Sequence, residues 1–258
     1  MSAVDEPLPV LTWHSISDTA GPTAIDAATF RMQVDELARQ GYRALTVAEF
    51  VTWQRAPTAV AGRRALLTFD DGYADFANAA FPVLGTHGYP AVVFLPTGRI
   101  GAREDWAGAN QPPRLLLDWA TVRGLAAAGV EFGGHGVTHA DLTRLSPAAR
   151  RAEIVGCRDD LAARVAVAAR SFAAPYGRVD AAVVADIERH FDVAFGTRFD
   201  LARPGDPRCD VPRIEMHYFR DQRRWRSFLR GDHAYFHTRR ALRAAGSAAR
   251  SLLAREET

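Results

Sequence analysis

Residues 65–73, ALLTFDDGY, contain the pattern on which the fold assignment depends. The apolar run Ala65–Phe69 ends abruptly at two adjacent carboxylates, Asp70 and Asp71, which are followed by Gly72. A short apolar run bounded by turn residues is typical of a buried strand in a parallel sheet. Two carboxylates at the end of such a strand are costly unless they are paired or bind a metal. An Asp-Gly turn that simply ends a strand has the same local pattern, so this stretch alone leaves both interpretations open.

Similar apolar runs alternate with amphipathic stretches along the chain, as in α/β proteins. The other expected strands are Pro9–Trp13, Arg43–Leu45, Ala91–Leu95, Val130–Phe132, Ser171–Ala173 and Val193–Phe195. The expected helices are Asp26–Gln40, Val47–Trp53, Asp75–His87, Trp119–Ala128, Pro147–Ala168 and Ala181–His190. About seven strand–helix units without a domain break predict a single domain, a distorted (β/α) barrel of parallel strands that is closed or nearly closed. We expect this barrel to span residues 1–237 and residues 238–258 to form an Ala/Arg-rich helix or tail.

A pair of histidines follows a second expected strand. In residues 133–139, GGHGVTH, His135 and His139 are four residues apart, which is a common spacing for two zinc ligands. Two partly exposed loop histidines are the plainer interpretation of the pair alone. Together with a carboxylate from the 65–73 stretch, however, the pair supplies two nitrogens and one oxygen. Such a triad leaves positions open for water and substrate, as in catalytic metal sites.

Composition excludes several other classes of function. A chain of 258 residues with 48% hydrophobic and 24% charged residues is of ordinary globular composition. All 32 Lys+Arg residues are Arg, so lysine Schiff bases and P-loop chemistry are excluded. Cys157 and Cys209 lie far apart and predict neither a disulfide framework nor a thiolate metal site.

The two ends of the chain bear on where the protein is located in the cell and on whether it contacts a membrane or a nucleic acid. The N-terminal residues lack a basic segment followed by an apolar stretch, and no apolar run could span a bilayer, so we expect a cytoplasmic protein. From Arg213 onward there are 11 Arg against 5 acidic residues. This Arg-rich C-terminus leaves open a peripheral membrane contact. It contains no nucleic-acid-binding motif, and we expect no nucleic-acid partner.

Three motifs in a fixed order resemble the polysaccharide deacetylase family, the NodB-homology carbohydrate esterases. They are TFDDG at 68–72, the HxxxH pair at 135–139 and SFAAPYG at 171–177. LTWHSIS at 11–17 resembles the YHxI-like start of one subgroup, and VPRIE at 211–215 extends the similarity, which covers about Leu8 to Met216. The resemblance implies a distorted (β/α) barrel that removes acetyl groups from N-acetylated sugars with one divalent metal ion.

The resemblance also implies roles for individual residues. Asp71, His135 and His139 would be the metal ligands, with Zn²⁺ the expected ion and Co²⁺ or Ni²⁺ as alternatives. Asp70 would be the general base that takes a proton from the attacking water. The backbone N–H of Tyr176 would help to hold the oxyanion.

Two histidines compete for the role of general acid. His14 follows the first expected strand, and His217 follows the VPRIE stretch; the position of His14 in its motif makes it the preferred choice. Pro175, Tyr176 and His217 are the expected substrate-binding residues.

The chain departs from the family pattern at several positions. Gly134 and Gly136 stand where Ser and Thr are usual, which removes side-chain hydrogen bonds from the loop of His135. Ala173 stands where many members have an Arg that orients the base, although the FAYPYG-type subgroup also lacks this Arg. Ala174 replaces the aromatic residue of that FAYPYG-type subgroup. Asp75 is expected to be a surface helix residue, and the alternative is that it supports the site residues from behind.

The expected function is therefore metal-dependent removal of an acetyl group from an N-acetylated sugar or sugar-containing intermediate. One alternative is hydrolysis of another small amide, such as a formyl group or a cyclic imide. Another is a non-catalytic carbohydrate-binding protein on the same fold. The substrate itself is left open.

Overall fold

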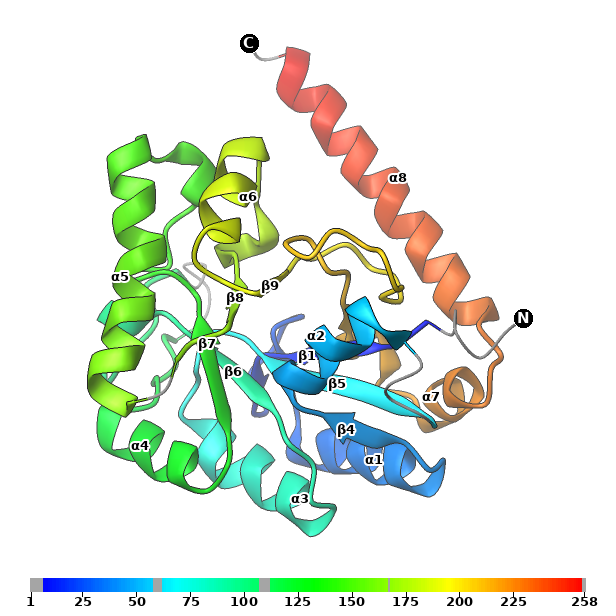
Figure 1. Ribbon diagram of the computed structural model, residues 1–258. Helices are drawn as coiled ribbons and strands as arrows, with labels where there is room; N and C mark the ends of the chain where they lie inside the picture. The colour runs from blue at the N-terminus through cyan, green and yellow to red at the C-terminus, as the bar shows by residue number, and fades with distance from the viewer. Residues whose placement is uncertain (1–6, 58–61, 107–111, 167, 257–258) are drawn as a thin grey trace.

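The chain folds as a barrel of parallel strands surrounded by helices (Figure 1). The structure is a computed structural model that describes residues 7–57, 62–106, 112–166 and 168–256. The strands are β1 (Val10–Trp13), β4 (Arg43–Leu45), β5 (Arg64–Phe69), β6 (Val92–Leu95), β7 (Glu131–Gly134), β8 (Ser171–Ala173), β9 (Val193–Phe195) and β10 (Ile214–Glu215). Their order is β10-β1-β5-β6-β7-β8-β9, and β4 pairs with the beginning of β5. The predicted α/β barrel is confirmed.

The barrel closes irregularly between β9 and β10. These two strands are not neighbours in a continuous ladder, but Phe195 of β9 forms an isolated parallel bridge with Val211, just before β10. Antiparallel hydrogen bonds between Leu8 and Ala202 tie the start of the chain to the same region. β10 then pairs with β1, so the last strand of the barrel lies beside the first.

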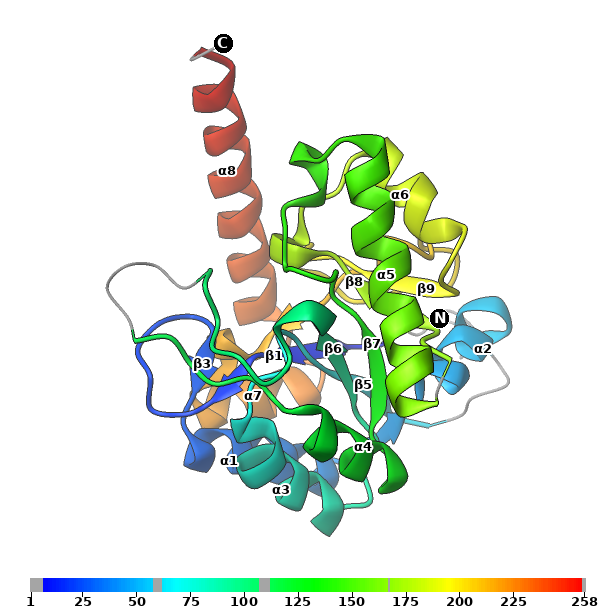
Figure 2. The same ribbon diagram turned by 90° about the vertical axis from the view of Figure 1, so that its left-hand side faces the viewer.

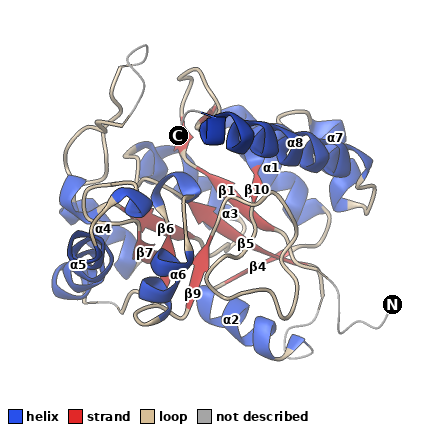
Figure 3. Cartoon of the chain, turned by 90° about the horizontal axis from the view of Figure 1, so that it is seen from above, coloured by secondary structure: helices blue, strands red, loops and turns tan. Residues whose placement is uncertain are grey.

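Eight α-helices are described: α1 (Ala27–Arg39), α2 (Val47–Arg55), α3 (Phe81–Thr86), α4 (Trp119–Ala127), α5 (Pro147–Val165), α6 (Ala181–Glu188), α7 (Gln222–Leu229) and α8 (Ala234–Glu256). Seen from above, they surround the strands (Figure 3). Six of them begin at a side-chain cap that accepts a hydrogen bond from a backbone N–H three residues on. The caps are Asp26, Thr46, Asp118, Ser146, Asp180 and Asp221.

Some elements differ from the sequence-based expectation. The single helix expected over 75–87 is a π-helical turn, Phe76–Ala80, followed by α3. Pro82 in the first turn of α3 has no N–H to donate, which prevents a continuous α-helical ladder at this point. A short parallel pair, β2 (Ser15–Ile16) and β3 (Ala24–Ile25), was not expected.

The C-terminal helix α8 begins against the barrel and extends beyond it (Figures 1 and 2). Its first turns pack on the body of the protein through Phe236, which is buried, and through an ion pair between Arg240 and Asp200. The division of the chain at residue 237 stays a prediction. Among the described residues, no helix is both long enough and apolar enough to cross a membrane.

Candidate active site

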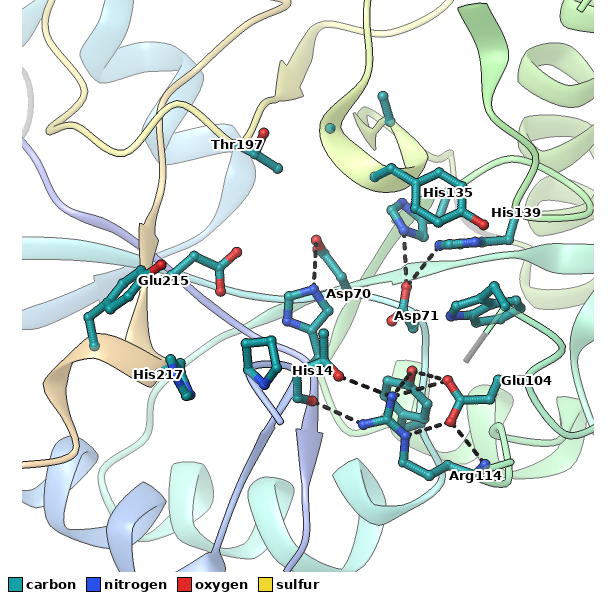
Figure 4. A pocket seen from close by; sticks show the side chains of 18 of the residues that line it. His14, Asp70, Asp71, Glu104, Arg114, His135, His139, Thr197, Glu215 and His217 are labelled. Carbon is teal, nitrogen blue, oxygen red and sulfur yellow. Dashed lines mark hydrogen bonds and ion pairs between the residues drawn. The ribbon is translucent and has the colours of Figure 1, made fainter. Parts of the chain in front are cut away.

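A pocket of about 530 Å³ opens at the carboxyl ends of the barrel strands. Parallel strands deliver the residues that follow them to one end of a barrel, where active sites of this architecture lie. The pocket is lined by residues that follow seven barrel strands, β1, β5, β6, β7, β8, β9 and β10. Among them are Tyr176 and the labelled residues His14, Asp70, Asp71, His135, Thr197 and His217 (Figure 4). All the site residues predicted from the sequence except Pro175 line this one pocket.

Three buried side chains form a candidate metal site. Oδ1 of Asp71 lies 3.2 Å from Nε2 of His135 and 3.2 Å from Nε2 of His139. The three potential ligand atoms lie within 4.8 Å of one another. Nδ1 of His135 bonds to the carbonyl of Ala173 at 2.7 Å; this contact places the proton on Nδ1 and leaves Nε2 free as a ligand atom. The donor set and the tautomer therefore fit a divalent metal ion.

The electrostatics of this triad also suit a cation. Burial opposes ionisation of Asp71, but its contacts with the two imidazoles hold its pKa well below the usual value. Burial lowers the pKa of His139 and so favours its neutral, metal-binding form. Burial alone would also lower the pKa of His135, but the Asp71 contact and the negative charges of Asp70 and Asp71 raise it. A cation bound here would replace the proton on His135, so that one carboxylate and two imidazole nitrogens would face the ion.

The backbone is strained at the same place. Of the four non-glycine residues with positive φ in the described part of the chain, three are site residues: Asp71 (71°), His139 (63°) and Tyr176 (60°). Each such conformation costs about 1–3 kcal/mol and persists only where the surrounding structure imposes it. The barrel thus imposes unfavourable backbone geometry on the residues that converge in the pocket.

The loop of His135 requires its glycines for space. A Cβ at Gly134 would lie 2.7 Å from Sγ of Cys157, and a Cβ at Gly136 would lie 2.8 Å from Oε2 of Glu153. Glu153 itself accepts hydrogen bonds from the backbone N–H groups of Val137 (2.7 Å) and Thr138 (2.9 Å). A carboxylate from α5 therefore supports the loop. No local sequence pattern indicates this role for Glu153, because its partners are 15 and 16 positions away.

Asp70 is held in a buried bidentate ion pair. Nη1 and Nη2 of Arg213 donate to Oδ1 and Oδ2 of Asp70, each at 2.7 Å, and both side chains are almost fully buried. Burial would raise the pKa of Asp70, but the charge and hydrogen bonds of Arg213 outweigh it and lower the pKa. The Arg that the sequence lacks at position 173 is thus supplied from the VPRIE stretch. No local pattern in the VPRIE stretch indicates this role for Arg213, because Asp70 is 143 positions away.

The two candidate general acids occupy different parts of the pocket (Figure 4). Nε2 of His14 lies 3.8 Å from Oδ2 of Asp70, and the His14 side chain is 15% exposed. His217 lies farther than His14 from the carboxylates of Asp70 and Asp71. Its Nδ1 is 3.2 Å from a guanidinium nitrogen of Arg220. Burial and the charges of Arg220 and Arg239 lower the pKa of His217.

Aromatic rings surround His139. The ring of Trp106 stacks on it, with centroids 4.0 Å apart, and Tyr176 meets it edge-on at 4.7 Å. The Tyr176 side chain is half exposed and lines the pocket. Pro175 is buried beside Gly136 and is not among the residues that line the pocket.

Two further groups of polar contacts lie next to the candidate site. Arg114 donates to Glu104 at 2.6 Å and to the hydroxyl of Tyr73 at 2.6 Å, which forms a buried network at the side of the pocket. The expectation that Asp75 is a surface helix residue is wrong, because its side chain is partly buried. Its carboxylate accepts hydrogen bonds from the Ser15 hydroxyl and the Ile16 backbone N–H, and so secures the segment that follows His14.

Comparison with known proteins gives consistent matches. A family model described as polysaccharide deacetylase matches residues 58–191, slightly more than half of the chain. The Bacillus subtilis protein YxkH is 28% identical over 150 residues, which are 57% of this chain and 48% of that protein. The poly-β-1,6-N-acetyl-D-glucosamine N-deacetylase of Escherichia coli K12 is 30% identical over 91 residues, 34% of this chain and 13% of that protein.

The fold is also shared with a solved structure. IcaB from Ammonifex degensii superimposes with a TM-score of 0.73 at 21% identity, covering 89% of this chain and 98% of that one. The chain spans about half the length of YxkH and a smaller part of the Escherichia coli enzyme. Since the family model covers more than half of the sequence, including the motifs that supply the buried Asp-His-His triad, the chain belongs to the polysaccharide deacetylase family.

Proposed function

We propose that this protein is a metal-dependent hydrolase that removes the acetyl group from an N-acetylated sugar. The observation that carries the proposal is the adjacency of two differently held carboxylates in one pocket. Asp71 faces two imidazoles, and Asp70 is fixed by Arg213. Adjacent carboxylates in different environments can divide the work of metal binding and proton transfer between them.

Two imidazole nitrogens and one carboxylate oxygen suit Zn²⁺, and Co²⁺ or Ni²⁺ bind similar sets. When bound, such an ion lowers the pKa of a coordinated water and polarises the amide carbonyl. Asp70 is ionised because of Arg213 and can accept the proton of the attacking water. The bidentate contact fixes the orientation of that carboxylate for the transfer.

His14 is the better candidate for protonating the leaving amine. It lies beside Asp70, close to where the amide bond would be cleaved. His217 accepts a hydrogen bond from Arg220 on Nδ1, and its lowered pKa keeps it neutral near pH 7. A neutral imidazole is a weak proton donor, so His217 is better suited to hydrogen bonding with a substrate.

Features of the pocket lining support a sugar as substrate. Trp106 and Tyr176 present aromatic rings beside the metal site, and polar side chains line the rest of the pocket. The name of the Escherichia coli relative specifies a polymer of N-acetyl-D-glucosamine, which supports an N-acetylglucosamine-type unit. We propose that the N–H of Tyr176 stabilises the developing oxyanion.

The test is acetate release from a panel of N- and O-acetylated sugars, with and without added Zn²⁺. The wild type should release acetate only with the metal, and Asp70→Asn should lower kcat by about 10²–10⁴-fold through loss of the base. Asp159→Asn, the same change at an exposed side chain, is the matched control and should keep wild-type activity. Release of formate or opening of a cyclic imide without any acetate release would replace the acetyl assignment. Equal rates for Asp70→Asn and wild type would refute the proposed base.

A further inference from the structure

Helix α8 presents arginines to the barrel, where an amphipathic helix usually presents apolar side chains. Phe236 is buried, but the next partly buried positions on the same face are Arg239, Arg240 and Arg243. Arg243 lines the same pocket as the metal triad. The C-terminal helix therefore contributes a cation to the candidate active site.

Arg243 is fixed by uncharged partners. Its Nη1 donates to the hydroxyl of Tyr218 at 3.1 Å, and its Nη2 donates to the carbonyl of Thr197 at 3.2 Å. The guanidinium has five N–H donors, so these two contacts orient it without using its full hydrogen-bonding capacity. Within the described ranges, no carboxylate forms an ion pair with Arg243. Its charge is held at the pocket and is not neutralised there.

Arg239 reinforces this charge. Its guanidinium lies 4.2 Å from the centroid of the Tyr218 ring, one helical turn before Arg243. Its Nε is buried and has no hydrogen-bond partner in the part of the chain that the structure describes. Arg240, between them, differs: it forms an ion pair with Asp200 at 2.9 Å.

Other charged groups at this end of the pocket do not cancel the positive charge of Arg243 and Arg239. Glu215 is the carboxylate that lines it, and Arg220 adds another cation beside His217. Asp26, whose pKa Arg220 helps to lower, is already engaged as the N-cap of α1. Arg243 and Glu215 are therefore the charged residues that line this end of the pocket, and Arg239 and Arg220 add two guanidiniums beside the lining residues Tyr218 and His217.

This cationic end is separated from the metal triad. Thr197, Glu215 and His217 lie across Asp70 and His14 from His135 and His139 (Figure 4). Arg243 is on the Thr197 side because it donates to that carbonyl. A group bound here would belong to a part of the substrate remote from the amide that is cleaved.

We propose that Arg243, supported by Arg239, binds an anionic group, a phosphate or a carboxylate, on the N-acetylated sugar. The proposal rests on the proposed function and specifies its substrate class. Guanidinium groups match the geometry of both anions and bind them with charge-assisted hydrogen bonds. Neutral sugars would leave these arginines without a counter-charge.

The test measures binding separately from turnover. Glucose 1-phosphate, glucuronic acid and methyl glucoside contain no amide, so their dissociation constants can be measured by calorimetry on the intact, zinc-loaded protein. The wild type should bind at least one of the two anionic probes about tenfold or more tightly than methyl glucoside, the ratio expected for a charge-assisted hydrogen bond. Arg243→Gln should abolish this preference, and Arg240→Gln, the same change on the same helix, should retain it.

A wild type that binds the three probes equally, or an Arg243→Gln variant that keeps the preference, would overturn the anionic subsite. Thermal unfolding of both variants checks that each is folded. Acetate release from N-acetylglucosamine 1-phosphate and methyl N-acetylglucosaminide is measured in parallel. An Arg243-dependent anion preference without any acetate release would support the subsite and reject the deacetylase assignment.

Discussion

At the scale of single residues, the position of the Asp70 carboxylate is set by Arg213. The guanidinium donates to both carboxylate oxygens and also to the Gly196 carbonyl, so it links β5 to the irregular junction after β9. A lysine at this position would retain the charge but could not make two parallel hydrogen bonds. The orientation of the Asp70 carboxylate should therefore depend on the planar guanidinium of Arg213 and not only on its positive charge.

We predict that Arg213→Lys lowers kcat for acetate release by about 10–100-fold with little change in KM, since a misplacement of about 1 Å can cost 10²-fold. Steady-state kinetics on the folded variant, checked by thermal unfolding, measures the effect. Arg170→Lys, at an exposed ion pair with Asp192, serves as the control and should behave as wild type. A folded Arg213→Lys enzyme with an unchanged kcat would show that the bidentate contact is dispensable.

At the scale of elements, Glu36 joins α1 to α7. Its side chain is 1% exposed and accepts hydrogen bonds from Arg226 of α7 and from Arg39 and Gln40. The hydrogen bond from Arg226 is the main cause that lowers the pKa of Glu36 to about 2. Because the folded-state pKa is depressed, this contact stabilises the fold above the ordinary pKa near 4.5 and is lost as the pH falls toward 2.

We predict that Glu36→Gln lowers the free energy of unfolding by about 1.5–3 kcal/mol at pH 7, the range for hydrogen bonds to a charged group. The difference from wild type should shrink between pH 4.5 and pH 2, where Glu36 becomes protonated in the wild type. Urea denaturation across this range tests it, with Glu188→Gln at an exposed position as the control. A difference that is constant with pH would argue against the ion pair.

A helix or strand can be predicted from the sequence when a pattern within its own residues determines it. The three-residue strands β4, β8 and β9 were expected with the bounds that the structure has. β2, β3 and β10 are only two residues long, which is too short for any periodic pattern.

The same distinction holds for the site. The triad of Asp71, His135 and His139 was found because each ligand lies in a local motif that follows a strand. Arg213 lies 143 positions from Asp70, and Arg114 lies 41 positions from Tyr73. Only the closure of the barrel brings these pairs together. Their contacts therefore could not be predicted from local patterns in a single sequence.

At the scale of the whole molecule, the candidate metal site joins two separate parts of the barrel. Asp71 follows β5, and both histidines follow β7, with β6 between these two strands in the sheet. Asp71 is 64 or more positions from either histidine along the chain, so the unfolded chain has no preorganised site. A metal ion that binds the three residues should therefore stabilise the native state as a whole.

We predict that Zn²⁺ at about 100 times its dissociation constant adds about 2.7 kcal/mol of stability to the wild type. For a chain of this size, that corresponds to a rise in Tm of about 5–10 °C, which EDTA should reverse. Asp71→Asn should lose most of the rise, whereas Asp159→Asn should keep it. Ca²⁺, which prefers six to eight oxygen ligands, should give little stabilisation because two of the three donors are imidazole nitrogens. An equal zinc-dependent rise in Asp71→Asn and wild type would place the ion elsewhere, so this measurement tests the site independently of any substrate.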